Sequence, residues 1–299
     1  ANAGTAGVSG AISIVSGTAS SGSSGQVTIE TGKSFGGAGG NIKMSVGNGD
    51  AGDKGGDVGL FAGDSSAPGG AGGTVVIKGG DTDGSLESSV GGSVDIAAGS
   101  SAGATGGNVV LQSGASWLYS SGDILIETPN AGKQGSSGSI TLRTGTTNEG
   151  SSGSISLVTS ASTGGGGGQI SIAVGVGNGG SGGNLVLQAG NIDSEGGISG
   201  GSIVMKAGNS IDSNGKSQAG EGGNIGITAG SSIGTGGSIR VQTGFSEAIS
   251  SGSLIMSSSD STGSDGSGLI RVATGNANVN SGSIEIRTGE AISGSAGNI

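Results

Sequence analysis

The chain has 299 residues, of which 75 are Gly and 2 are Pro, and it carries a formal net charge of −10. Gly does not fall at every third position, so collagen is excluded, and the acidic balance disfavours nucleic acid and anionic membrane surfaces as partners. The absence of Cys and His removes disulfides and most nucleophilic, general-base and transition-metal sites. No apolar run approaches the roughly 20 residues needed for insertion into a bilayer.

A nine-residue phrase recurs along the whole chain: a small residue, Gly, any residue, an aliphatic residue, any residue, an aliphatic residue, any residue, a small residue and usually Gly. We number these positions 1 to 9. A short, nearly constant period predicts a repeat architecture and argues against the disordered linker that a Gly-rich composition otherwise suggests. The eighteen phrases begin at Ser9, Ser24, Gly39, Gly55, Gly72, Gly91, Gly106, Ser121, Ser137, Ser152, Gly167, Gly182, Gly200, Gly222, Gly236, Ser251, Ser267 and Ser281, and a nineteenth at Ala296 is cut off at Ile299.

Positions 4 and 6 are aliphatic in every phrase, from Ile12 and Ile14 at the start to Ile284 and Ile286 near the end. A period of two with many β-branched residues predicts a strand with one buried face. A helix needs spacings of three and four, and each internal Gly costs it about 1 kcal/mol. We therefore expect strands of six or seven residues with these 36 aliphatic side chains buried.

Position 2 is Gly in every phrase and lies on the same strand face as positions 4 and 6. Either the backbone has a positive φ at this point, or another part of the chain passes too close for a Cβ. Position 8 stays small or of modest size. Position 9 is Gly except at Pro129, Ser160 and Ser259, which predicts a closing turn.

All variation in spacing falls between position 9 and the next phrase, with the longest insertions at 209–221 and 81–90, as expected for loops. Such units can form an antiparallel meander or a parallel β-solenoid, and we favour the solenoid because identical phrases then stack in register. One phrase per coil sets aliphatic residues against Gly and Ser, whereas two phrases set two aliphatic sheets face to face. The prediction is an all-β protein in which residues 1–299 form one continuous parallel β-solenoid of ~15-residue strand-loop units, with two units per coil and two opposed sheets, within a longer chain.

Acidic residues gather in the Gly-rich turns between Asp50 and Asp83. They distantly resemble the calcium-binding nonapeptide repeats of bacterial toxins, but those repeats have Asp in every turn and a nine-residue period, and this chain has neither. We therefore interpret them as solvated loops and predict no metal, cofactor-binding or catalytic residue, since no phosphate-loop motif follows a strand either. The oxygen ligands considered are the run 48–53 with Asp57, Asp64, Asp81 and Asp83.

The outward positions 3, 5 and 7 carry mixed residues, including charges, instead of the uniform Thr array of an ice-binding surface. Aromatic residues that could stack on sugars form one pair, Trp117 and Tyr119, in a single loop. The outward aliphatic residues are candidates for packing between copies, and Phe35, Phe245 and the aromatic pair either join that contact or cover loop edges. These aliphatic residues are Val76, Val110, Leu125, Val186, Val204 and Ile255.

The repeat pattern and the Gly/Ser-rich loops resemble those of long secreted β-solenoid proteins of microbial surfaces, such as adhesin shafts and filament subunits. The resemblance implies a non-enzymatic structural protein in an extracellular filament or cell-surface appendage, with no cofactor and no membrane insertion. Because the first phrase looks like every other and no capping segment is visible, we expect end-to-end self-association. The alternatives are an adhesive or ligand-binding stalk and, less favoured, an ice-binding protein, and the Ser/Thr-rich loops leave carbohydrate modification or contact open.

Overall fold

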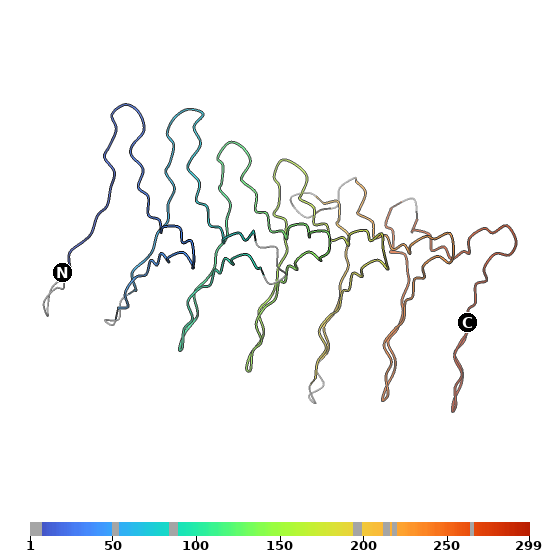
Figure 1. Cartoon of the computed structure of the whole chain (residues 1–299). Coiled ribbons are helices and arrows are strands. Elements are labelled where there is room, and N and C mark those ends of the chain that lie inside the picture. The colour runs from blue at the N-terminus through green and yellow to red at the C-terminus, as the bar shows by residue number, and fades with distance from the viewer. Residues whose placement is uncertain are drawn as a thin grey trace. The chain divides into compact units, whose positions relative to one another are not determined.

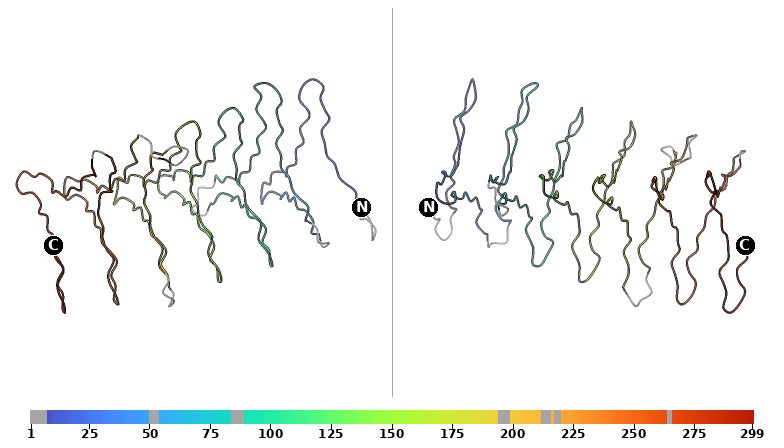
Figure 2. Two further views of the ribbon diagram at one scale, coloured as in Figure 1. Left: turned by 180° about the vertical axis from the view of Figure 1, so that it is seen from behind. Right: turned by 45° about the vertical axis from the view of Figure 1, so that its right-hand side comes forward.

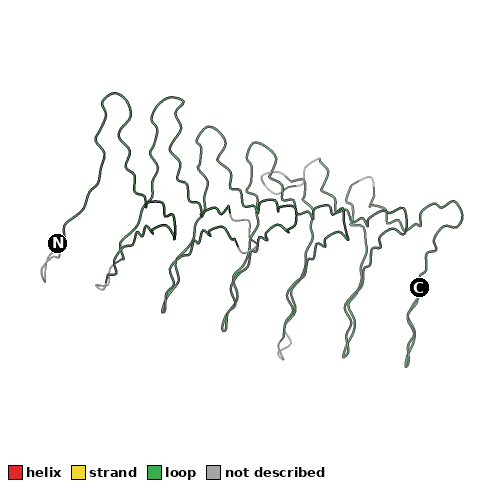
Figure 3. Ribbon diagram, in the orientation of Figure 1, coloured by secondary structure: helices red, strands yellow, loops and turns green. Residues whose placement is uncertain are grey.

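A computed structural model describes residues 8–49, 54–83, 89–193, 199–211, 216, 220–263 and 266–299. The chain divides into two units, Ala1–Ser152 and Gly153–Ile299. Over the described ranges the backbone is extended and irregular, without an α-helix or a β-strand (Figure 3). Among these residues, Ile211 alone forms an isolated β-bridge. Short hydrogen-bonded turns occur at Pro68–Gly69 and Lys133–Gln134.

The predicted all-β fold is therefore wrong for the described part of the chain, and so are the parallel β-solenoid and its two opposed sheets. Only positions 4 and 6 are bulky in every phrase, while Gly makes up 75 of 299 residues. Fixing a residue in an extended conformation costs roughly 1–2 kcal/mol of backbone entropy, and the cost is highest for Gly. Two aliphatic residues per phrase do not offset that cost within one chain. The alternation of aliphatic and other residues is therefore present in the sequence, but no sheet forms among the described residues.

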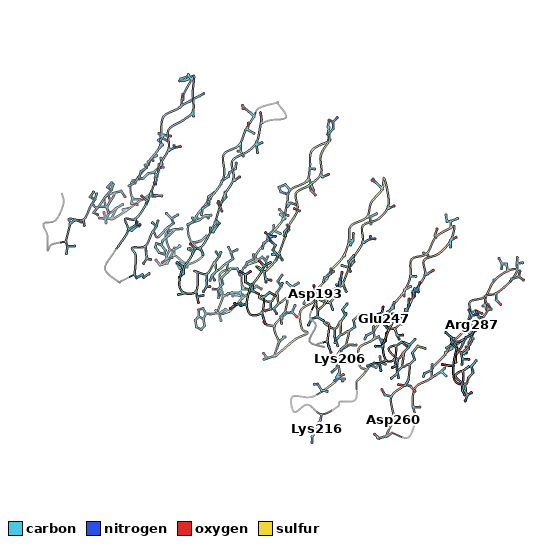
Figure 4. The ribbon with its side chains drawn as sticks, turned by 90° about the horizontal axis from the view of Figure 1, so that it is seen from below. Asp193, Lys206, Lys216, Glu247, Asp260 and Arg287 are labelled. Carbon is cyan, nitrogen blue, oxygen red and sulfur yellow. The ribbon has the colours of Figure 1, made fainter. Side chains whose placement is uncertain are left out.

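The direction of the loops recurs every third phrase. In the first unit, the loops at 18–23, 64–71 and 115–120 project to the same side, as the blue to green part of the ribbon shows (Figures 1 and 2). In the second unit, Lys216 and Asp260 lie in loops three phrases apart, and both are on one side of the ribbon (Figure 4). The direction of the loops thus repeats after three phrases, and not after the two phrases predicted for each coil.

No side chain among the described residues is buried, so the expected burial of positions 4 and 6 is wrong. The two faces of each phrase nevertheless differ in how exposed their side chains are. Beyond Ile12, position 4 is 49–59% exposed and position 6 is 60–74% exposed, whereas the outward aliphatic residues Val76, Val110, Leu125, Val186, Val204 and Ile255 are 74–83% exposed. The alternation thus sets which face is less exposed, although it does not create a core.

Local sequence does determine one turn in full. The loop at 64–71 contains Ala67-Pro68-Gly69-Gly70, in which the N–H of Gly70 donates to the carbonyl of Ala67 at 2.9 Å. Gly69 has a φ of +76°, close to the value at the third residue of a type II turn, and Pro68 has the fixed φ that suits the second residue. This turn needs no tertiary support.

Candidate functional site

The best-defined local structure is the point where each loop leaves and rejoins the phrases, which we call the neck. It consists of positions 8 and 9 of one phrase and position 2 of the next. At eight necks the N–H of position 2 donates to the carbonyl of position 9, at distances of 2.8–3.1 Å. The bonded pairs are Gly63–Gly73, Gly80–Gly92, Gly99–Gly107, Gly114–Gly122, Gly190–Gly201, Gly208–Gly223, Gly230–Gly237 and Gly244–Gly252.

The neck stays the same while the loop changes in length. The bonded residues are seven apart at Gly230 and Gly237, and fifteen apart at Gly208 and Gly223. Because one hydrogen bond closes loops of such different size, insertions do not alter the spacing of the flanking phrases. The predicted restriction of length variation to loops agrees with this arrangement.

At several necks the preceding position 8 packs too closely against position 2 for a Cβ to fit there. A Cβ added at Gly183 would lie 2.8 Å from Cγ1 of Val174, and one at Gly168 would lie 3.1 Å from Cβ of Thr159. Positive φ values among the described residues occur at Gly22, Gly69, Gly150, Gly266 and Gly294, which all lie in loops. The sequence offered two explanations for Gly at position 2. At these necks the structure confirms the close approach of another part of the chain, and it does not show a positive φ there.

Three necks are closed by a side chain. The hydroxyl of Thr31 donates to the carbonyl of Gly40 at 3.1 Å, and Thr128 and Thr159 donate in the same way to Gly138 and Gly168 at 3.2 Å. In each case position 8 donates to position 2 of the next phrase. At Thr128 this closure precedes Pro129, one of the exceptions to Gly at position 9.

The neck is also where the described chain is least exposed. Twelve described residues are half-buried, and nine of them occupy position 8. They are Ser16, Ala62, Gly79, Ser113, Thr128, Ala189, Ala207, Ala229 and Thr243. The main packing contact of this chain is therefore a small side chain on a glycine Cα.

A second recurrent motif, a turn closed by a Ser side chain, was not predicted from the sequence. Two residues after position 9, a Ser side chain often accepts a hydrogen bond from a backbone N–H further along the loop, for example Gly165 N–H to Ser162 Oγ at 3.1 Å. Such local bonds are the turn motifs that Ser favours. The available signal was Ser at a fixed distance after position 9. The acceptors are Ser34, Ser101, Ser116, Ser162, Ser232, Ser246 and Ser261.

The side chains at positions 4 and 6 form what we call the aliphatic stripe. It contains only Ile, Val, Leu and Met, and its members are 49–74% exposed except Ile12 at 92%. Charged residues lie instead at the outward positions and in the loops. The exposed ion pairs Lys54–Asp57 and Lys78–Asp81, at 2.9 and 2.6 Å, belong to that polar surface and contribute little to stability.

The acidic residues considered for calcium do not converge in the described structure. Residues 50–53 lie outside the described ranges, while Asp57 and Asp81 are each paired with a Lys. Groups of three or more potential metal ligands do not occur among the described residues. In the second unit, the six charged side chains labelled in Figure 4 come from four loops and two phrases and are spread along the unit.

The aromatic residues are at the surface. Trp117, Leu118 and Tyr119 are 102%, 85% and 87% exposed at the tip of one loop, whose backbone is held by the bond from Tyr119 N–H to Ser116 Oγ at 3.0 Å. Phe35 lies beneath the ammonium of Lys33, which is 5.2 Å from the ring centroid. Phe245 is 86% exposed and makes no closed site with the others.

A depression of about 280 Å³ is lined by Arg143, Thr144, Gly145 and Thr146, so a single bend of the chain makes it. Among the described residues, no helix has the length and apolar character needed to cross a bilayer. No protein-family model matches the chain, and no curated protein or solved structure is significantly similar to it.

Proposed function

We propose that this chain is a non-enzymatic structural protein that associates with itself and forms, or lies within, an extracellular filament or cell-surface appendage. The observation that carries the proposal is the aliphatic stripe, which repeats in every phrase and is left half-exposed by the single chain. Enzymes hold reacting groups in an enclosed, rigid site. The repeated feature here is an uncovered apolar surface, which suits assembly.

The sequence pattern supports the same proposal. Its Gly/Ser-rich repeats resemble those of microbial surface filaments and adhesin shafts, which also favours a location outside the cell. In a repeat protein each unit contacts its neighbouring units, so stability grows with the number of units. A chain of eighteen near-identical phrases is suited to this additive mode.

The experiment is sedimentation velocity combined with negative-stain electron microscopy of the 299-residue chain from about 0.1 to 100 μM. This range spans the affinities of weak to moderately strong self-association. We expect large unbranched species to increase with concentration without any added ligand. A single monodisperse monomer over the whole range would contradict the proposal.

A second candidate function is an adhesive stalk, and the loop with Trp117 and Tyr119 favours it. Aromatic side chains at an exposed, locally fixed tip can stack on sugar rings or pack against an apolar partner. On this alternative, intrinsic Trp fluorescence changes on addition of an oligosaccharide panel, and Trp117→Ala abolishes binding. A chain that binds no glycan but still assembles supports the filament alone.

A further inference from the structure

The described chain leaves far more surface in water than a folded monomer of its size. Its accessible surface is 29,291 Å² for a mass of 27.4 kDa. A folded monomer of that mass exposes about 11,000 Å², and a fully unfolded chain about 40,000 Å². More than half of the surface that folding usually removes is thus still exposed, and the aliphatic stripe is part of it.

We propose that the aliphatic stripe is a docking surface for a second copy of this chain, with the stripe of one copy packed on that of another. The inference rests on the proposed function and deepens it by naming the interface. It differs from the end-to-end contact expected from the sequence, because it involves phrases along the chain and not only the terminal ones. The outward face then remains in water.

The chemistry of the two faces selects this orientation. Positions 4 and 6 carry no charge in any phrase, whereas the outward positions carry both signs. The latter include Glu30, Lys43, Asp95, Arg143 and Lys206. An interface through the stripe removes Ile, Val, Leu and Met from water and leaves the ions solvated. The opposite orientation would desolvate charges, at a cost of several kcal/mol for each uncompensated ion.

The area and the repeat together identify the partner as an identical chain. A stable complex buries about 1,200–2,000 Å² in total, a small fraction of the roughly 18,000 Å² by which this chain exceeds a folded monomer. The same type of neck hydrogen bond closes loops whose bonded ends are seven to fifteen residues apart. Another copy presents the same stripe at the same recurrence, so a contact made at one phrase can be repeated at the phrases that the three-phrase recurrence brings to the same side.

The test uses two double variants in the phrase at 167–175. Ile170→Asp/Ile172→Asp places two charges on the stripe, at side chains that are 51% and 62% exposed. Gln169→Asp/Ser171→Asp places two charges on the outward face of the same phrase. Both variants change the net charge by the same amount, from −10 to −12. The difference between them therefore reports the face and not the charge.

The readout is energy transfer between donor- and acceptor-labelled copies over a concentration series. Because the chain contains no Cys, a Ser66→Cys background gives one labelling site in an exposed loop. We expect the stripe variant to need about tenfold or more protein for half-maximal transfer, since a charge must be desolvated in an apolar contact. The outward variant should stay within about threefold of the unmodified chain.

The outcomes separate this inference from the proposed function. If both variants assemble as the unmodified chain does, or if both lose assembly equally, the stripe is not the interface, although the filament proposal stands. If the unmodified chain shows no transfer at any concentration, both proposals fail. Amide exchange at the distant neck of Gly237 serves as the structural control and should be the same in all three proteins.

Discussion

At the scale of single residues, the glycine at position 2 has a role that its neighbours explain. At the necks with a side chain at position 8, that side chain packs against the Cα of the next position 2, for example Ala229 against Gly237, where an added Cβ would lie 3.3 Å away. The same glycine donates the neck hydrogen bond to Gly230 at 2.8 Å. One residue type thus serves both the contact and the bond, which accounts for its recurrence.

Gly237→Val should open its neck. The added side chain meets Cβ of Ala229 and the backbone N of Gly230, at 3.3 and 3.2 Å from the new Cβ. Loss of the hydrogen bond, typically about 0.5–1.5 kcal/mol, predicts roughly two- to tenfold faster amide exchange at residue 237. Gly226→Val is the matched control, because nothing lies within 4 Å of its Cβ position. Equal exchange at residue 237 in the two variants would contradict the packing explanation.

Ser162→Ala should loosen the loop at 161–166. The substitution removes the acceptor of the 3.1 Å bond from Gly165 N–H, and such a local bond contributes about 0.5–1.5 kcal/mol. We expect roughly two- to tenfold faster proteolytic cleavage within this loop, with cleavage slowed again in Ser162→Thr, which retains a hydroxyl. Ser156→Ala, on the outward face of a phrase, is the control and should leave the rate unchanged.

At the scale of elements, the molecule consists of phrases of constant length and loops of variable length, joined by necks. The loop between Gly114 and Gly122 and the longer loop between Gly80 and Gly92 end in the same type of bond, at 2.9 and 2.8 Å. Loop-closure entropy changes slowly with length, so the additional residues cost little. Loop length is therefore free to vary in this design, whereas phrase length is not.

Insertions should show this difference directly. Adding Gly-Ser after Ser66, in the loop at 64–71, should leave the exchange rate at Gly73 and the assembly of the chain unchanged. A single Ala inserted between Val75 and Val76 shifts every later residue of the phrase to the other face. We expect this second variant to lose the neck that follows, at Gly92, and to assemble more weakly by energy transfer. If both insertions are tolerated equally, phrase and loop are not distinct elements.

The sequence predicted the phrases, the loops and the less exposed face, because each depends on local pattern alone. Val75 and Ile77, on the predicted inner face, are 49% and 65% exposed, whereas Val76 between them is 78% exposed. The β-solenoid was wrong because strand pairing depends on how closely successive phrases approach, and two aliphatic residues do not determine that distance. The Ser turns were not predicted because Ser is common throughout these loops, so its presence alone does not mark the position that accepts a hydrogen bond.

At the scale of the whole molecule, the neck hydrogen bonds and the exposed aliphatic stripe respond differently to protein concentration. Each neck hydrogen bond forms within one chain, so it does not depend on protein concentration. The aliphatic stripe, as we propose, is buried by other copies, so its burial does depend on concentration. Exposed ion pairs such as Lys54–Asp57, with side chains 81% and 75% exposed, add little to either. We therefore expect local order to survive dilution and stripe-dependent order to disappear.

Residue-resolved amide hydrogen exchange of the dilute chain, below its assembly concentration, tests this description most directly. The neck amides of Gly73, Gly107, Gly122, Gly201 and Gly237 have hydrogen-bond acceptors within the chain. We predict slower exchange at these amides than at positions 4 to 6 of the phrases, since bonded amides exchange only on local opening. Strong and uniform protection of positions 4 to 6 in the dilute chain would show that phrases pair within one molecule, and would contradict the account.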